Sequence, residues 1–204
     1  MEPLVFGLVG CGHHGRAAVI PAMLKCGAAR LAAVCDLSAA NLAAVEGAGI
    51  RRFSSLKEML SAAKLDAVYV ATPVDAHAAA VIEALNAGCH VITEKPMAMS
   101  VDECRAMLAA AKAAGKTLAV DFESRVIPHY RRIRSLIDQG MLGAVRAVHI
   151  DHFWDGHKPV GELGERRKRF LDRSGCLDCG IHKIDLARYF SGGGAWRRIH
   201  AVGS

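Results

Sequence analysis

The residues from Gly10 to Gly15 have the spacing of a turn that binds phosphate groups. They read GCGHHG, a G-x-G-x-x-G pattern, between an apolar run of strand length and a helical pattern. In such a turn Gly10 permits a tight bend, Gly12 lets a pyrophosphate approach the backbone, and Gly15 lets the helix pack close to the sheet. Free N–H groups at the helix start then face the phosphates. We expect the backbone of the whole turn to bind a dinucleotide: Gly10, Cys11, Gly12, His13, His14 and Gly15.

Asp36 is a second candidate for dinucleotide binding. It follows the second apolar run, 21 residues after Gly15. A carboxylate there can accept hydrogen bonds from both hydroxyls of the adenosine ribose, and it would repel a 2′-phosphate. No arginine follows Asp36 closely, so NAD is favoured over NADP. The alternatives are that Asp36 only caps the next helix, and that His13 and His14 are polar side chains on an exposed turn.

Three further residues have side chains suited to proton transfer and charge stabilisation. Lys95, in the segment TEKP at 93–96, follows the fifth apolar run, and open α/β sheets bind ligands at the carboxyl ends of their strands. Lys95 is therefore well placed to meet a nicotinamide and a substrate hydroxyl, although the same residues also suit an exposed loop. Asp178 and His182 are four residues apart, so they share one face of a helix. By itself His182 also suits a histidine in a core.

The elements that must position these residues alternate regularly over residues 1–120. Such alternation predicts an α/β fold of the Rossmann type, a doubly wound parallel sheet with helices on both faces. The expected strands cover residues 4–9, 30–35, 52–53, 66–71, 90–93 and 117–120. The expected helices cover residues 14–26, 38–46, 55–63, 74–87 and 101–114, and Pro21 is expected to disturb the first.

The pattern changes after residue 120, which we interpret as a domain boundary. The expected elements are an arginine-rich helix over residues 127–139, a half-exposed strand over 143–153, a polar irregular segment over 154–175, a helix over 177–190 and a strand over 198–202. Residues 121–204 are therefore predicted to form an incomplete α/β domain.

Several ordered motifs resemble those of the glucose–fructose oxidoreductase, inositol dehydrogenase and rhizopine-catabolism family, written Gfo/Idh/MocA. The resemblance runs from Val5 to about Phe190. It rests on the glycine turn, ATP at 71–73 with His77, AGCHV at 87–91, EKP at 94–96, then Phe122, Arg125, Pro128 and DCGIHKID at 178–185. Asp121 departs from the family, which more often has a small residue there.

The resemblance implies an NAD-dependent dehydrogenase that acts on a secondary hydroxyl or ketone of a sugar, polyol or nucleotide sugar. Lys95 would hydrogen-bond the reacting oxygen, His182 would exchange its proton, and Asp178 would orient the substrate or the histidine. Further residues would line the cofactor crevice, position the cofactor or link the domains: Ala71, Thr72, Pro73, His77, Glu94, Lys95 and Arg125. Of these, His77 looks more structural than catalytic.

These roles agree with the chemistry of alcohol oxidation. A hydride leaves carbon for C4 of the nicotinamide, which is the cofactor's own chemistry, and a proton leaves oxygen. Histidine, with a reference pKa of about 6.5, can accept that proton near neutrality. The ammonium group of Lys95 stabilises the charge that develops on the oxygen.

The second domain is expected to be shortened. Members of this family usually carry a large open sheet there, which covers the active site and often mediates oligomerisation, whereas residues 121–204 hold at most two expected strands. A two-stranded sheet is marginal alone and leaves strand edges exposed. We therefore expect a truncated product, a shortened domain that self-associates into a homo-oligomer, or a fragment that needs a partner.

Composition and cysteine spacing indicate the cellular location, the state of the thiols and whether a metal is bound. No apolar run approaches the roughly 20 residues that cross a bilayer, and the start lacks a signal-peptide pattern, so we expect a cytoplasmic location and no membrane contact. Seven scattered cysteines indicate reduced thiols. Cys176 and Cys179 form a C-x-x-C pair, but no second pair has zinc-site spacing, so we expect no metal.

Two other functions stand beside the dehydrogenase. A catalytically inactive dinucleotide sensor or partner-binding protein suits the shortened second domain, but the retained Lys95, Asp178 and His182 argue against it. Nucleic-acid binding suits the net charge of +6 and the arginine-rich runs at 131–134 and 166–169, but neither run is interleaved with stacking aromatics. We interpret these runs as solvated faces that attract anionic cofactors or substrates, and expect no nucleic-acid partner.

Overall fold

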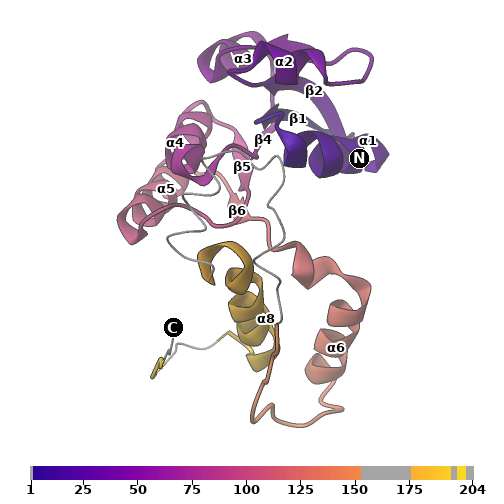
Figure 1. Cartoon of the computed structure of the whole chain (residues 1–204), viewed down its shortest axis with the longest axis vertical. Coiled ribbons are helices and arrows are strands. Elements are labelled where there is room, and N and C mark those ends of the chain that lie inside the picture. The colour runs from indigo at the N-terminus through magenta and orange to yellow at the C-terminus, as the bar shows by residue number, and fades with distance from the viewer. Residues whose placement is uncertain (1, 153–175, 194–196, 201–204) are drawn as a thin grey trace. The chain divides into compact units, whose positions relative to one another are not determined.

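The computed structural model describes residues 2–152, 176–193 and 197–200. Its internal contacts divide the chain into two units, Met1–Asp121 and Phe122–Ser204. The first unit contains the sheet, and the described part of the second is built from helices and extended segments (Figure 1).

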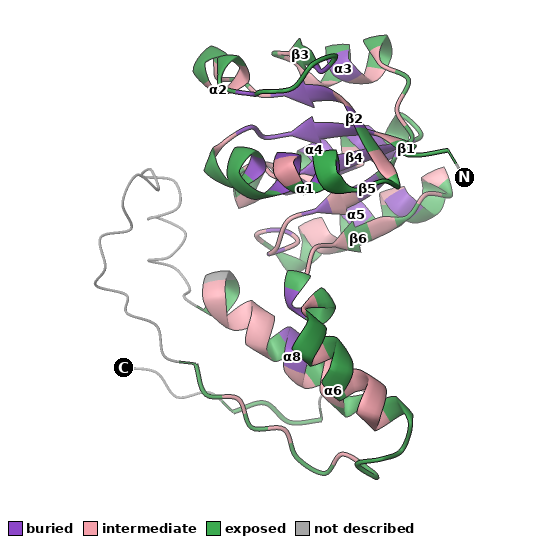
Figure 2. Ribbon diagram, turned by 90° about the vertical axis from the view of Figure 1, so that its right-hand side faces the viewer, coloured by how far each residue is buried: buried purple, intermediate pink, exposed green. Residues whose placement is uncertain are grey.

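A six-stranded parallel sheet forms the centre of the first unit, in the order β3-β2-β1-β4-β5-β6 (Figure 2). The order reverses between β1 and β4, and in open α/β sheets ligands bind at the carboxyl ends of the strands beside such a reversal. The doubly wound Rossmann sheet that the sequence predicts is therefore confirmed. The strands are β1 (Leu4–Val9), β2 (Ala29–Cys35), β3 (Arg51–Phe53), β4 (Ala67–Val70), β5 (His90–Thr93) and β6 (Leu118–Val120).

Helices cover both faces of the sheet (Figure 2), because successive side chains of a buried strand point to opposite faces. Leu8 packs in an apolar cluster with Met23 of α1, whereas its neighbour Val9 packs in a second cluster with Leu85 of α4. The helices of this unit, with short π- or 3₁₀-helical turns written η, are η1 (Gly15–Val19), α1 (Ile20–Lys25), α2 (Ala39–Ala43), α3 (Leu56–Ala62), η2 (Val74–Ala76), α4 (His77–Asn86) and α5 (Val101–Ala114).

Side-chain caps define where several of these helices begin and end. The hydroxyls of Ser38, Ser55 and Ser100 each accept a hydrogen bond from a backbone N–H three residues on. Glu103 completes a capping box by accepting from the backbone N–H of Ser100 at 3.0 Å. Gly115 ends α5 in a left-handed conformation, at a φ of 62°. These local contacts explain why the helices begin and end at these residues.

The second unit, where it is described, contains the helices η3 (Glu123–Val126), α6 (Pro128–Asp138), η4 (Cys176–Gly180) and α8 (Ile181–Ser191). The strand predicted over 143–153 is wrong for residues 143–152, which are not in a strand. A strand needs a neighbour for its backbone hydrogen bonds, and none pairs with these residues in the described part of the chain. Residues 198–200 are not in a strand either, while 153–175 and 201–202 lie outside the described residues.

Candidate cofactor-binding and active site

The glycine turn joins β1 to η1 at the carboxyl end of the sheet. Gly10 has a φ of +98°, and a Cβ on it would lie 2.5 Å from the carbonyl carbon of Ala71. A Cβ on Gly15 would overlap the carbonyl oxygen of Gly10. A Cβ on Gly12, in contrast, would meet no atom of the described residues within 4 Å. The fold itself therefore requires glycine at 10 and 15, whereas Gly12 borders open space.

Asp36 is attached to the glycine turn through its carboxylate. Oδ2 accepts hydrogen bonds from the backbone N–H of Cys11 at 2.7 Å and from the side-chain amide of Asn41 at 3.2 Å. Oδ1 accepts from the backbone N–H of Ser38 at 2.8 Å. The cap of α2 is the Ser38 hydroxyl, which accepts from the backbone N–H of Asn41 at 3.3 Å. The capping role that was the alternative for Asp36 is therefore filled by Ser38.

Arg52 of β3 holds the segment that follows α2. Its guanidinium donates hydrogen bonds to the carbonyl oxygens of Leu42 at 3.1 Å, Val45 at 2.6 Å and Ile50 at 3.2 Å. α2 ends at Ala43, earlier than the predicted limit at residue 46, and these bonds hold the non-helical segment that follows it. The same contacts keep this guanidinium engaged with backbone.

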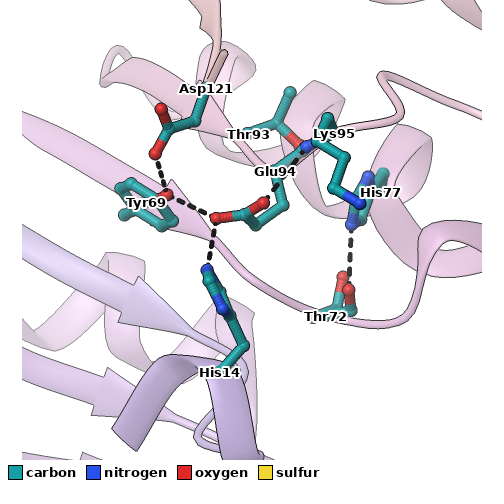
Figure 3. Close-up of polar contacts among 8 residues, drawn as sticks. All are labelled: His14, Tyr69, Thr72, His77, Thr93, Glu94, Lys95 and Asp121. Atoms are coloured by element: carbon teal, nitrogen blue, oxygen red, sulfur yellow. Dashed lines mark hydrogen bonds and ion pairs between the residues drawn. The ribbon is translucent and has the colours of Figure 1, made fainter. Parts of the chain in front are cut away.

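Glu94 lies directly after β5 and is held by three donors (Figure 3). Its Oε1 lies 2.7 Å from His14 Nε2 and 2.7 Å from the Tyr69 hydroxyl, and its Oε2 accepts from the backbone N–H of Lys95 at 3.3 Å. Burial by itself raises the pKa of Glu94, but the hydrogen bonds from His14 and Tyr69 outweigh burial and hold that pKa below its ordinary value. Glu94 therefore links the glycine turn to the segment that carries Lys95.

His77 joins two further segments of the predicted site. Its ring is buried at the start of α4, with Nε2 2.9 Å from the carbonyl oxygen of Thr72 and Nδ1 2.9 Å from that of Pro96. Figure 3 shows the ring between the Thr72 segment and the strand end that bears Lys95. Both ring nitrogens face backbone, so the observed contacts of His77 are structural.

The second unit holds the other two predicted catalytic residues. Asp178 lies in η4 and His182 in the first turn of α8. The ring of His182 packs edge-on against Phe122, with 6.3 Å between the ring centroids. Because Lys95 belongs to the first unit, its meeting with Asp178 and His182 at one reacting atom stays a prediction.

Arg125 forms a bidentate ion pair with Asp185 in the second unit. Nε donates to Oδ2 at 2.7 Å, and Nη2 lies 2.5 Å from Oδ1. These hydrogen bonds raise the pKa of Arg125 above its ordinary value. The pair joins η3 to α8, so the observed role of Arg125 is to hold the second unit together, and its predicted role in cofactor binding stays a prediction. The observed partner of Asp185 is therefore Arg125.

Sequence reasoning missed Tyr69 and Asn41 as neighbours of the predicted site. Tyr69 lies inside an apolar run, where an aromatic residue indicates a core, and Asn41 lies in an ordinary helical pattern. Asp121 gave one signal, its departure from the small residue typical of the family. Only the sheet order, which puts the ends of β4, β5 and β6 side by side, brings Tyr69 and Asp121 to Glu94.

Family models match both units of the chain. The model described as an oxidoreductase family with an NAD-binding Rossmann fold matches residues 4–122, and the model of the Gfo/Idh/MocA C-terminal domain matches residues 130–204. The chain belongs to the Gfo/Idh/MocA family of oxidoreductases. The membership that the sequence motifs indicated is thereby confirmed.

Curated members of the Gfo/Idh/MocA family are longer than this chain. Inositol 2-dehydrogenase of Rhizobium meliloti (strain 1021) is 32% identical over 92% of this chain and 54% of its own length. D-glucoside 3-dehydrogenase of Escherichia coli (strain K12) is 34% identical over 84% of this chain and 49% of its own length. The chain therefore spans about half the length of the curated relatives it matches.

Solved Gfo/Idh/MocA structures share the fold. The WlbA dehydrogenase of Bordetella pertussis, in complex with NADH and UDP-GlcNAcA, matches with a TM-score of 0.77 and 31% identity over 93% of this chain and 55% of that protein. Scyllo-inositol dehydrogenase of Lactobacillus casei, with bound NAD(H) and scyllo-inositol, matches with a TM-score of 0.72 and 25% identity over 94% of this chain and 57% of that protein.

Within residues 2–152, 176–193 and 197–200, no helix is long and apolar enough to cross a membrane.

Proposed function

We propose that this chain binds NAD in its first unit and serves hydride transfer between the nicotinamide and a secondary hydroxyl or ketone of a sugar, polyol or nucleotide sugar. The observation that carries the proposal is the glycine turn, whose Gly12 borders open space while Asp36 is fixed to the backbone of Cys11 at 2.7 Å. The residues present fit a dinucleotide, because that arrangement leaves room for a pyrophosphate beside a carboxylate suited to a ribose.

Thr72 adds a second feature that suits a bound ligand. Its Oγ1 is buried and has no hydrogen-bond partner among the described residues. An unpaired buried hydroxyl is costly, so such groups usually face a ligand or an ordered water. Thr72 follows β4, next to the point where the strand order reverses, which is where the family resemblance places the cofactor crevice.

The choice of NAD over NADP follows from charge. The Asp36 carboxylate would repel a 2′-phosphate, and recognition of that phosphate usually needs a nearby arginine. β3 pairs with β2, the strand that precedes Asp36, and Arg52 on β3 is a candidate to bind such a phosphate. However, its guanidinium already donates hydrogen bonds to three backbone carbonyl oxygens. A 2′-phosphate would therefore be repelled by the carboxylate of Asp36, and the guanidinium of Arg52 would not be available to balance its charge.

The reaction itself would divide between cofactor and protein. When bound, the nicotinamide supplies the hydride chemistry. Lys95 would donate a hydrogen bond to the reacting oxygen and stabilise negative charge there. His182 would exchange the proton of that oxygen, and Asp178 would orient the substrate or His182. The substrate class rests on the relatives, whose names include an inositol dehydrogenase and a glucoside dehydrogenase.

Titration with NADH and NADPH, followed by nicotinamide fluorescence, tests the cofactor assignment. We expect saturable binding that prefers NADH. Asp36→Ala should weaken NADH binding roughly tenfold or more, because hydrogen bonds to a charged group are lost, and should reduce the discrimination against NADPH. Asp102→Ala is the matched control, since its carboxylate is exposed on α5 and should leave both affinities unchanged. Unaltered affinities in Asp36→Ala would remove Asp36 from the cofactor site.

Turnover tests the assignment of the reaction. The full chain is incubated with NAD and a panel of inositols, sugars and nucleotide sugars, and NADH formation is followed by absorbance. Lys95→Ala should abolish turnover while NADH affinity changes by less than about tenfold. Cofactor binding without turnover on any member of the panel would support the alternative of an inactive dinucleotide-binding protein.

A further inference from the structure

The carboxylate of Asp36 already accepts three hydrogen bonds from the protein. Its Oδ2 accepts from the backbone N–H of Cys11 at 2.7 Å and from the side-chain amide of Asn41 at 3.2 Å. Its Oδ1 accepts from the backbone N–H of Ser38 at 2.8 Å. An ionised carboxylate offers about four acceptor positions, two on each oxygen. One position, on Oδ1, is therefore left for a ligand.

This count limits what Asp36 can do for a ribose. The sequence predicts that Asp36 accepts hydrogen bonds from both hydroxyls of the adenosine ribose, and two hydroxyls need two acceptor positions. While the three observed bonds are kept, only one hydroxyl can donate to Asp36. The other hydroxyl needs a second partner at the same place.

The side chain of Asn41 can supply that second partner. A carboxylate only accepts hydrogen bonds, so the group of Asn41 that faces Asp36 must be its NH2. The amide oxygen, Oδ1 of Asn41, is then the acceptor that remains. Within the part of the chain that the structure describes, no residue donates a hydrogen bond to this oxygen, and the side chain is only half-buried.

The position of Asn41 is fixed beside the glycine turn. Its backbone N–H donates to the hydroxyl of Ser38 at 3.3 Å, which caps α2, and Asp36 holds the backbone N–H of Ser38 in turn. β1 and β2 are neighbours in the sheet, so the segment after β2 lies next to the turn after β1, and the contact of Asp36 with Cys11 joins the two. In a dinucleotide the adenosine ribose is attached directly to the pyrophosphate, so a ribose site is expected here.

We propose that Asn41 is a ribose-binding residue, and that Asp36 and Asn41 each bind one hydroxyl of the adenosine ribose. One hydroxyl donates to Oδ1 of Asp36. The other donates to Oδ1 of Asn41, whose NH2 keeps its hydrogen bond to Asp36. This inference rests on the proposed binding of NAD and adds Asn41 to the site.

Two variants remove the amide of Asn41 without removing the cap of α2. The cap uses the backbone N–H of this residue, and alanine is the residue most favoured in a helix, so Asn41→Ala should keep the fold. Asn41→Leu keeps the size of the side chain without its polar groups. Asn86→Ala is the matched control, because it makes the same change at the exposed last residue of α4. Thermal unfolding of each variant checks that it folds.

Competition against NADH, followed by nicotinamide fluorescence, measures each hydroxyl separately. The competitors are NAD and two NAD analogues that lack the 2′- or the 3′-hydroxyl of the adenosine ribose. In the unaltered chain and in Asn86→Ala, the analogue that lacks the hydroxyl bound by Asp36 should bind roughly tenfold or more weakly than NAD. The other analogue should bind roughly fivefold more weakly, since its lost hydrogen bond is to an uncharged group.

The two Asn41 variants decide the proposal. NAD should bind them roughly fivefold more weakly than it binds the unaltered chain, and one analogue should then bind as well as NAD, while the other keeps its full loss. An unchanged NAD affinity, or full losses for both analogues, would show that Asn41 does not contact the ribose. Reduced losses for both would show that Asn41 acts only through Asp36, and would overturn the division of the hydroxyls. Absence of NADH binding to the unaltered chain would refute the proposed function instead.

Discussion

The two units differ in how their predicted site residues are supported. In the first unit, two apolar clusters enclose the sheet, and the residues at the strand ends are connected by hydrogen bonds. In the second, Leu186 is the one large apolar side chain that is buried among the described residues, while Ile133, Ile184 and Ile199 are exposed. A core that surrounds a site fixes its geometry more firmly than surface contacts do. The cofactor half of the site should therefore stand by itself.

Truncation of a buried leucine should weaken NADH binding when the leucine lies in the first unit, and should leave it unchanged when the leucine lies in the second. Leu8→Ala should lower the free energy of unfolding of the first unit by about 3 kcal/mol, because it opens a cavity between sheet and helices. Leu186→Ala should loosen the second unit and leave NADH affinity unchanged. Denaturant unfolding, NADH titration and amide hydrogen exchange measure these effects. Equal loss of NADH affinity in both variants would show that the first unit does not stand by itself.

Two glycines of one turn sharpen the comparison between folding and binding. Gly10→Ala should destabilise the first unit by about 2 kcal/mol, since its φ is left-handed and the new Cβ meets the backbone of Ala71. Gly12→Ala should leave the melting temperature nearly unchanged, because its Cβ points into open space, yet it should weaken NADH binding. Full NADH affinity in Gly12→Ala would mean that the open space is not the pyrophosphate site.

The smallest expected effect is an acid dependence of the first unit. The pKa of Glu94 is lower in the folded chain than its ordinary value of 4.5, so folding is stabilised above that pH. That contribution is lost as the pH falls through the lowered pKa. In Glu94→Gln the melting temperature should therefore change less between about pH 5 and pH 3, whereas the exposed control Glu58→Gln should follow the unaltered chain. Equal acid slopes in both variants would contradict the lowered pKa.

Local patterns in the sequence were sufficient for most of the first unit. The strand at His90–Thr93 and the helix at Val101–Ala114 were predicted with the bounds that the structure has, and the capping residues around α5 explain why. The prediction of a strand over residues 143–153 was wrong for residues 143–152, the part that the structure describes. Strand formation depends on a partner elsewhere in the chain, and alternation of side chains carries no information about that partner.

The sequence by itself determined the glycine turn, the place of Asp36 after the second strand, the EKP segment and the family, because each depends on residues that are close along the chain. Only the tertiary structure decided that the carboxylate of Asp36 accepts a hydrogen bond from the backbone N–H of Cys11. It also decided that Tyr69 meets Glu94 and Asp121. These contacts join residues from different strands, and their partners depend on the order in which the strands lie in the sheet.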